Sequence, residues 1–133
     1  MRAVAETARR FLETIWPDWH RQRGMPMPAI ASAGTCGRSA VFLARALREA
    51  GHPAEACQGW FLAHRHGWVS ARGLILDIAA DQFGAPPVLI CADPDPRYRP
   101  GPDTADPAFL AAREQDVAAI WLRWRGFAAT TLP

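Results

Sequence analysis

At 133 residues, the chain is long enough for one domain with its own hydrophobic core, and we expect a single domain over residues 1–133. Fifteen basic residues against 13 acidic ones leave a net charge of +2, which is too small to indicate nucleic acid or an anionic membrane as a partner. A signal peptide needs an uninterrupted apolar stretch, and charged residues interrupt the first 16 residues. No run approaches the ~18 apolar residues of a membrane span. We therefore expect a cytoplasmic protein.

The first two predicted elements are helices joined by a loop. The first carries its apolar face on Val4, Ala8, Phe11 and Ile15. We expect it to stop at Pro17, because proline lacks the N–H of an intrahelical hydrogen bond. Residues 17–34 hold three prolines and two glycines and are predicted to form a loop. A second helix is predicted over residues 36–50, with Gly34 or Thr35 near its N-cap and Gly51 as its stop.

Short strands are predicted in the middle of the chain, at residues 54–61, 65–70, 74–79 and 88–91. A tight turn at residues 71–73 joins the second and third strands into a hairpin. Residues 92–107 are rich in Pro, Asp and Arg, and we expect them not to pair in a sheet. Within them, the segment from Asp93 to Pro107 is either a lid that borders the active site or a rigid wrap over the sheet.

A last helix is predicted to begin at Pro107, with Asp106 as its N-cap. Its apolar face comprises Phe109, Val117, Ile120, Trp121 and Trp124. The order of elements is then helix, loop, helix, antiparallel strands and helix. This order predicts the α+β fold class, with N- and C-terminal helices around a small antiparallel sheet.

The cysteines are the first candidates for chemistry. Cys36, Cys57 and Cys91 are an odd number of widely spaced residues in a chain without an export signal, so we expect free thiols. Cys36 stands at the predicted start of a helix, where unpaired N–H groups and the positive helix end stabilise a thiolate. The alternative is a buried cysteine that packs as a small apolar residue.

The predicted hairpin strengthens the case for chemistry at Cys36. A two-residue turn at Ala71–Arg72, or a four-residue turn over Ser70–Gly73, places His66 directly across from Asp77. A three-residue turn would make the pair diagonal. Asp77 also stands in an otherwise apolar strand, where a carboxylate is costly unless it is paired. These residues suit a nucleophile, a general base and an acid that orients the base.

Three segments resemble the core motifs of the transglutaminase-like superfamily of papain-like cysteine hydrolases. They are Thr35–Leu47 (TCGRSAVFLARAL), His66–Val69 (HGWV) and Leu76–Phe83 (LDIAADQF). The resemblance implies Cys36 as nucleophile, His66 as base and Asp77 as the third catalytic residue, with Trp68 packed beside the histidine. It also implies a core in which the nucleophile helix packs on the sheet. Papain-type enzymes have a glutamine upstream of the cysteine as an oxyanion donor, and here that stretch offers only Ser32.

Four further residues are candidates for substrate binding. Trp60 and Trp68 either line an acyl pocket or belong to the core. Gln82 either donates to the substrate or to Asp77, or caps a turn. His64, two residues before His66, is a substitute base, a metal ligand together with Cys36 and His66, or a surface histidine.

The sequence thus predicts a Cys–His–Asp enzyme that acts on amide bonds of a peptide or protein through a thioester, without a metal or another cofactor. Peptidase, glutamine deamidase and small transglutaminase chemistry all share that intermediate. The alternatives are a leader peptidase for a ribosomally made natural product, or an inactive domain of the same fold that binds a peptide or a partner.

Overall fold

The structure is a computed structural model, and it describes residues 1–102 and 106–132. The helices in these residues are α1 (Arg2–Gln22), α2 (Cys36–Glu49), the short 3₁₀ helix η1 (Ala80–Phe83) and α3 (Pro107–Thr131). The strands are β1 (Glu55–Phe61), β2 (His64–Ala71), β3 (Leu74–Asp77), β4 (Leu89–Ala92) and β5 (Tyr98–Pro100). All neighbouring strands are antiparallel, in the order β4-β3-β2-β1-β5. The α+β prediction is confirmed.

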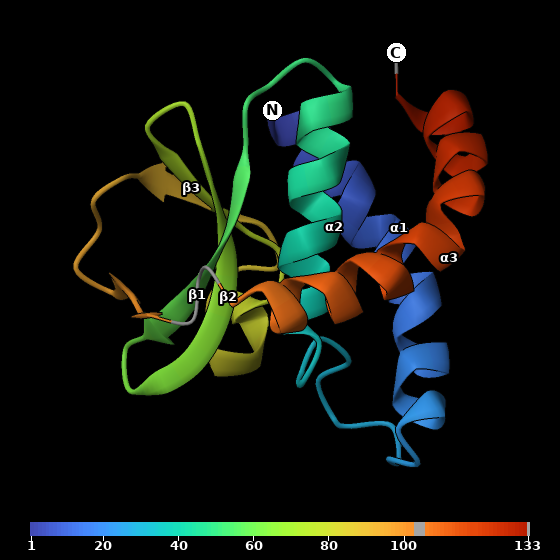
Figure 1. Ribbon diagram of the computed structural model, residues 1–133, viewed down its shortest axis with the longest axis horizontal. Coiled ribbons are helices and arrows are strands. Elements are labelled where there is room, and N and C mark those ends of the chain that lie inside the picture. Colours follow the sequence, from blue (N-terminus) through green and yellow to red (C-terminus); the bar gives the residue numbers. More distant parts are fainter. Residues whose placement is uncertain (103–105, 133) are drawn as a thin grey trace.

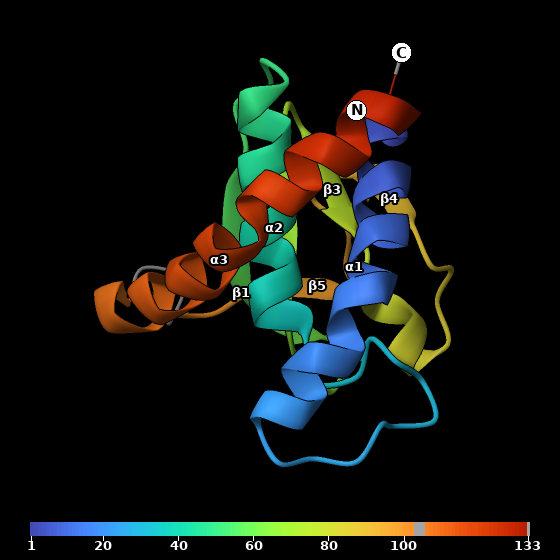
Figure 2. The ribbon, with the colours of Figure 1, turned by 90° about the vertical axis from the view of Figure 1, so that its right-hand side faces the viewer.

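Helix α2 lies at the centre, between the curled sheet on one side and α1 and α3 on the other (Figure 1). Seen from the side, α3 crosses α2, and a long loop connects the end of α1 to the start of α2 (Figure 2). The main core between these layers includes Phe11, Leu12, Trp16, Phe42, Leu43 and Trp124. A smaller cluster on the opposite face of the sheet comprises Phe61, Trp68, Ile75 and Tyr98.

Helix α1 does not stop at Pro17, so that prediction is wrong. The helix continues to Gln22 with the proline inside it. Trp16 and Trp19, on either side of the proline, are almost fully buried. Burying one large aromatic side chain contributes about 1.5–3 kcal/mol, comparable to the ~3 kcal/mol cost of an internal proline. Packing against α2 therefore carries the helix past its predicted end.

The β2–β3 hairpin forms, but its register differs from the prediction. Its two loop residues are Arg72 and Gly73, both with positive φ (50° and 74°), as a type I′ turn requires. The predicted turn was one residue too early, and Val69 pairs with Leu76. By this register His66 and Asp77 lie diagonally instead of directly opposite. They stay on one face, because the shift moves the pairing by an even number of residues.

The prediction that residues 92–107 do not pair is wrong for β5. This three-residue strand adds to the edge of β1, where Phe61 pairs with Tyr98 and Gly59 pairs with Pro100. Proline is tolerated there because an edge strand has one side that needs no ladder partner. The pairing favours the wrap over the lid for the described part of the segment, whereas residues 103–105 lie outside the described residues.

Helix α3 begins as predicted. The Asp106 carboxylate accepts hydrogen bonds from the N–H groups of Ala108 and Phe109 (3.0 and 3.3 Å), and Pro107 occupies the first turn. Of the predicted apolar face, Phe109 is only half-buried, and the others are buried. Neither α3 nor another helix of the described chain is both long and apolar enough to cross a membrane.

Candidate active site

Cys36 is the first residue of α2, as predicted. Thr35, the N-cap residue, does not cap the helix with its side chain, because its hydroxyl donates to the Ser32 carbonyl instead (2.7 Å). The first-turn N–H groups of α2 are therefore free to stabilise negative charge on the half-buried Cys36 thiol.

His66 and Asp77 form a buried pair. The imidazole Nε2 lies 2.7 Å from Asp77 Oδ2, and both side chains are essentially inaccessible to solvent. Burial lowers the pKa of the imidazole, but the hydrogen bond and charge of Asp77, followed by the Cys36 thiol, outweigh burial and raise it to about 9. His66 is therefore an imidazolium at neutral pH, held by its carboxylate.

The Cys36 thiol interacts with the side chain of His66. Nδ1 is buried and has no aligned hydrogen-bond partner among residues 1–102 and 106–132. Burial raises the pKa of the Cys36 thiol, but the interaction with His66 and the N–H of Gly67 outweigh burial and lower that pKa.

The other two thiols differ from Cys36. Burial raises the pKa of Cys57 on β1 and of Cys91 on β4, and neighbouring carboxylates raise both further. All three cysteines are free. Only the thiol at the start of α2 is thus acidified, and nucleophilic reactivity is expected at that position.

Tyr98 is a site residue that the sequence did not indicate. Its hydroxyl donates to Asp77 Oδ2 (2.8 Å), and the N–H of Ala79 donates to Oδ1 (2.9 Å). Together with His66, three groups satisfy the buried carboxylate and fix its orientation. The only sequence signal was that Tyr98 is the single tyrosine of the chain, in a segment expected not to pair.

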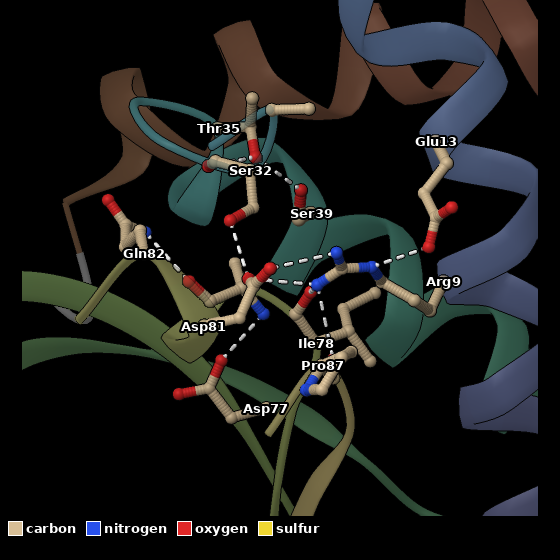
Figure 3. A network of polar contacts seen from close by, with 12 residues as sticks. Arg9, Glu13, Ser32, Thr35, Ser39, Asp77, Ile78, Asp81, Gln82 and Pro87 are labelled. Atoms are coloured by element: carbon tan, nitrogen blue, oxygen red, sulfur yellow. Dashed lines mark hydrogen bonds and ion pairs between the residues drawn. The ribbon is translucent and has the colours of Figure 1, made fainter. Parts of the chain in front are cut away.

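A second polar network lies next to this site (Figure 3). Its centre is Asp81 in η1, which accepts from the guanidinium of Arg9 (2.9 Å) and from the hydroxyl of Ser32 (2.6 Å). Arg9 also donates to the carbonyl of Ile78 (3.0 Å). Arg9 and Ser32 lower the pKa of the Asp81 carboxyl against the effect of burial. The network joins α1, the loop before α2 and the segment after Asp77.

A chain of hydroxyl groups extends this network to the residue next to Cys36 (Figure 3). Ser39 donates to the hydroxyl of Thr35 (3.0 Å), and Thr35 donates to the carbonyl of Ser32. All three side chains are buried. These hydrogen bonds hold the residue before Cys36 and the loop before α2 against the segment that follows Asp77. Ser32 is committed to that set and does not supply the second oxyanion donor.

The glutamine at position 58 is a further neighbour of Cys36 that the sequence did not indicate. Gln58 is buried on β1, opposite Gly67. A Cβ atom on Gly67 would lie 2.6 Å from the Gln58 amide nitrogen and 3.1 Å from the Cys36 carbonyl oxygen. The glycine therefore allows the Gln58 side chain and the main chain of Cys36 to approach each other.

The ring contacts of the two tryptophans predicted as substrate-binding are made with residues other than Cys36. Trp68 is buried in the smaller cluster, with its ring edge-to-face on Tyr98 (5.0 Å between centroids). Trp60 is half-buried, and the guanidinium groups of Arg65 and Arg99 lie over its ring (5.1 and 6.0 Å). The ring of Trp68 thus packs against the ring of Tyr98 and helps to hold it in place. The ring of Trp60 instead contacts two arginine side chains.

Gln82 and His64 lie at the rim of the site. The Gln82 amide donates to the carbonyl of Ala79 (2.8 Å). Of the two roles considered for Gln82, this hydrogen bond corresponds to capping a turn. His64 is exposed, and its ring stacks on Phe83 (4.3 Å), which also contacts the ring of His66. Within the described chain, no group of three or more His, Cys, Asp and Glu residues is placed to hold a metal ion.

The fold and the site together define an α+β domain with a Cys–His–Asp cluster at the start of its central helix. Comparison of the chain with protein-family models, with curated proteins and with solved structures finds no match. The function is therefore inferred from the geometry of the site and from the sequence motifs.

Proposed function

We propose that the protein is a cysteine-dependent amide hydrolase or acyl transferase with a transglutaminase-like core. One observation carries this proposal: His66 binds a buried carboxylate through Nε2 and also interacts with the acidified Cys36 thiol, while its buried Nδ1 has no other hydrogen-bond partner within the described residues. A histidine packed for stability alone does not need a half-buried thiol at a helix N-terminus as its second neighbour. The arrangement matches the nucleophile, base and orienting acid of a thiol enzyme.

The reaction follows from the charges at the site. The Cys36 thiolate attacks the carbonyl carbon of an amide, and the N–H of Cys36 is placed to stabilise the resulting oxyanion. The His66 imidazolium transfers its Nδ1 proton to the leaving amine, and the carbon–nitrogen bond breaks to give a thioester. Neutral His66 then takes a proton from water or an acceptor amine, which attacks the thioester and releases Cys36. Asp77 holds the ring throughout.

The substrate is proposed to be a peptide or protein. Three segments of the chain resemble the transglutaminase-like motifs, and they occupy the start of α2, β2 and the end of β3. The proposal includes three activities: peptidase, glutamine deamidase and small transglutaminase. A leader peptidase would be one kind of peptidase. Each activity forms the same thioester, and they differ in the substrate that is bound and in the nucleophile that attacks the thioester.

The proposal predicts that Cys36 is alkylated selectively. With iodoacetamide at about pH 6.5, we expect Cys36 to react at least about tenfold faster than Cys57 or Cys91, because only its thiol has a lowered pKa. Mass spectrometry of peptides from a time course measures the three rates. Equal and slow labelling would instead favour an inactive domain that binds a peptide or a partner.

A second prediction concerns Tyr98. Tyr98→Phe keeps the ring that packs on Trp68 but removes the hydrogen bond to Asp77, so the carboxylate is held less firmly against His66. We expect kcat/KM for p-nitrophenyl acetate to fall about tenfold, which corresponds to about 1.4 kcal/mol. Steady-state kinetics and a thermal melt of the same sample measure the effect. An unchanged kcat/KM would show that the hydroxyl has no positioning role.

A further inference from the structure

Three arginines surround the first turn of α2, and we call them the arginine cluster: Arg23, Arg38 and Arg113. Arg38 is the third residue of the helix. Arg113 of α3 packs so closely on Gly37 that a Cβ there would lie 3.2 Å from its Cδ and clash with its Nε. Arg23 donates to the carbonyl of Gly34 (3.4 Å). The sequence separates these residues, and the fold brings them to the end of the helix that carries Cys36.

The most buried member of the cluster lacks a full set of partners. Arg38 is only 5% exposed, and its Nη2 has no hydrogen-bond partner in the described part of the chain. Its guanidinium lies over the ring of Trp19 (4.5 Å), and the charge of Asp116 acts on it without a salt bridge. A buried cation is costly unless an anion pairs with it, so we expect an anionic group of a bound ligand to pair with the Arg38 guanidinium.

Arg9, the other buried arginine among residues 1–102 and 106–132, differs in this respect. Its guanidinium forms ion pairs with Glu13 and Asp81. No member of the arginine cluster forms an ion pair within residues 1–102 and 106–132, and the buried Nε of Arg113 is also unpaired there. Burial, and then repulsion from the neighbouring arginines, lower the pKa of Arg38 to about 10, so it stays charged at neutral pH.

The cluster lies beside the nucleophile. Arg113 packs on Gly37, the residue after Cys36, and Arg38 follows in the same first turn of the helix. The charge of Cys36 accordingly acts to raise the pKa of both guanidinium groups. The first-turn N–H groups of α2 add partial positive charge at the same place. Guanidinium groups bind carboxylates through paired hydrogen bonds of defined geometry.

We propose that the arginine cluster is a carboxylate-binding subsite, and that the natural substrate carries a carboxylate close to the amide that Cys36 attacks. The proposal rests on the proposed function and narrows its substrate class to acidic peptides or proteins. The carboxylate comes either from an Asp or Glu side chain or from a free C-terminus.

The test compares two alkylating reagents of similar size on the full chain. Iodoacetate carries a carboxylate and iodoacetamide does not. We expect Cys36 to react about tenfold faster with iodoacetate than with iodoacetamide at low ionic strength, whereas Cys57 shows no such preference. Added salt should reduce the preference, because it screens the attraction.

Variants assign the preference to the cluster. Arg38→Gln is expected to lower the iodoacetate rate about tenfold and the iodoacetamide rate by less than about twofold. Arg113→Gln, at a less buried position, is expected to act in the same direction and serves if Arg38→Gln does not fold. The matched control is Arg45→Gln, which removes a guanidinium from the ring of Trp121 (4.1 Å) further along α2 and should leave the ratio unchanged.

The outcomes separate the subsite from the proposed function. A Cys36 that reacts quickly with iodoacetamide but shows no preference for iodoacetate overturns the subsite alone. A preference that survives both Arg38→Gln and Arg113→Gln also overturns it. A Cys36 that is slow with both reagents contradicts the proposed function, and the substrate assignment with it.

The source of the carboxylate is found by protection of Cys36 from iodoacetate. The probes are Ac-Ala-Glu-NH2, which has a side-chain carboxylate, and Ac-Ala-Ala-OH, which has a terminal one. Ac-Ala-Ala-NH2, without a carboxylate, is the control. Protection by the first or second probe but not by the control supports the subsite and identifies the source. Equal effects of all three count against it.

Discussion

Cys36→Ser is expected to lower turnover of p-nitrophenyl acetate by about 10⁴–10⁶-fold, the range found when a catalytic nucleophile is removed. The site acidifies a thiol by placing it at the start of α2 beside the His66 imidazolium. A serine hydroxyl has a much higher intrinsic pKa than a thiol and stays protonated in the same place. We expect mass spectrometry to detect an acetyl–enzyme on Cys36 of the unaltered protein and none on the variant.

Cys57→Ser is the matched control for this experiment, since it makes the same chemical change at a thiol with a raised pKa. It is expected to retain turnover within about twofold, because the thiol of Cys57 donates to the Glu55 carbonyl and not to a member of the Cys–His–Asp cluster, and Ser is close to Cys in size. Equal activity of Cys36→Ser and the unaltered chain would refute the proposed nucleophile. Activity lost in Cys57→Ser would point to a different thiol.

Features that depend on neighbouring residues in the chain could be predicted. The start of α2 at Cys36 follows from a helical apolar pattern that begins there, and the start of α3 follows from Asp106 and Pro107. The pairing of His66 with Asp77 could also be predicted, because a carboxylate in an apolar strand needs a partner. Local physical chemistry thus indicated the right side chains, although it misplaced the turn between them by one residue.

Features that depend on tertiary packing could not be predicted. The helix continues past Pro17 because Trp16 and Trp19 are buried against other elements, which no local pattern reveals. Tyr98 reaches Asp77 only because β5 pairs with the edge of β1, across almost forty residues of chain. The arginine cluster is similar, since its members come from α2, α3 and the loop after α1.

Asp77→Asn is expected to lower kcat/KM by about 10³–10⁴-fold, as replacing the orienting acid of a catalytic triad does. The amide cannot stabilise an imidazolium as a carboxylate does, so the pKa of His66 should fall from about 9 towards its ordinary value of ~6.5. The reaction needs the thiolate and the imidazolium together. We therefore expect a bell-shaped pH profile for the unaltered protein, with its alkaline limb near 9, and an alkaline limb at lower pH for Asp77→Asn.

The same pair makes the stability of the protein pH-dependent, with a sign set by the raised pKa of His66. The stabilisation from the charged His66–Asp77 pair is complete below the unfolded value of ~6.5 and is lost as the pH rises through about 9. Melting temperatures measured from about pH 6 to 10 should therefore fall more steeply for the unaltered protein than for Asp77→Asn. Asp18→Asn, at an exposed carboxylate of α1, should follow the unaltered protein in both experiments. If the alkaline limb of Asp77→Asn stays near 9, the carboxylate does not set the protonation of His66, and another group must keep the imidazolium charged.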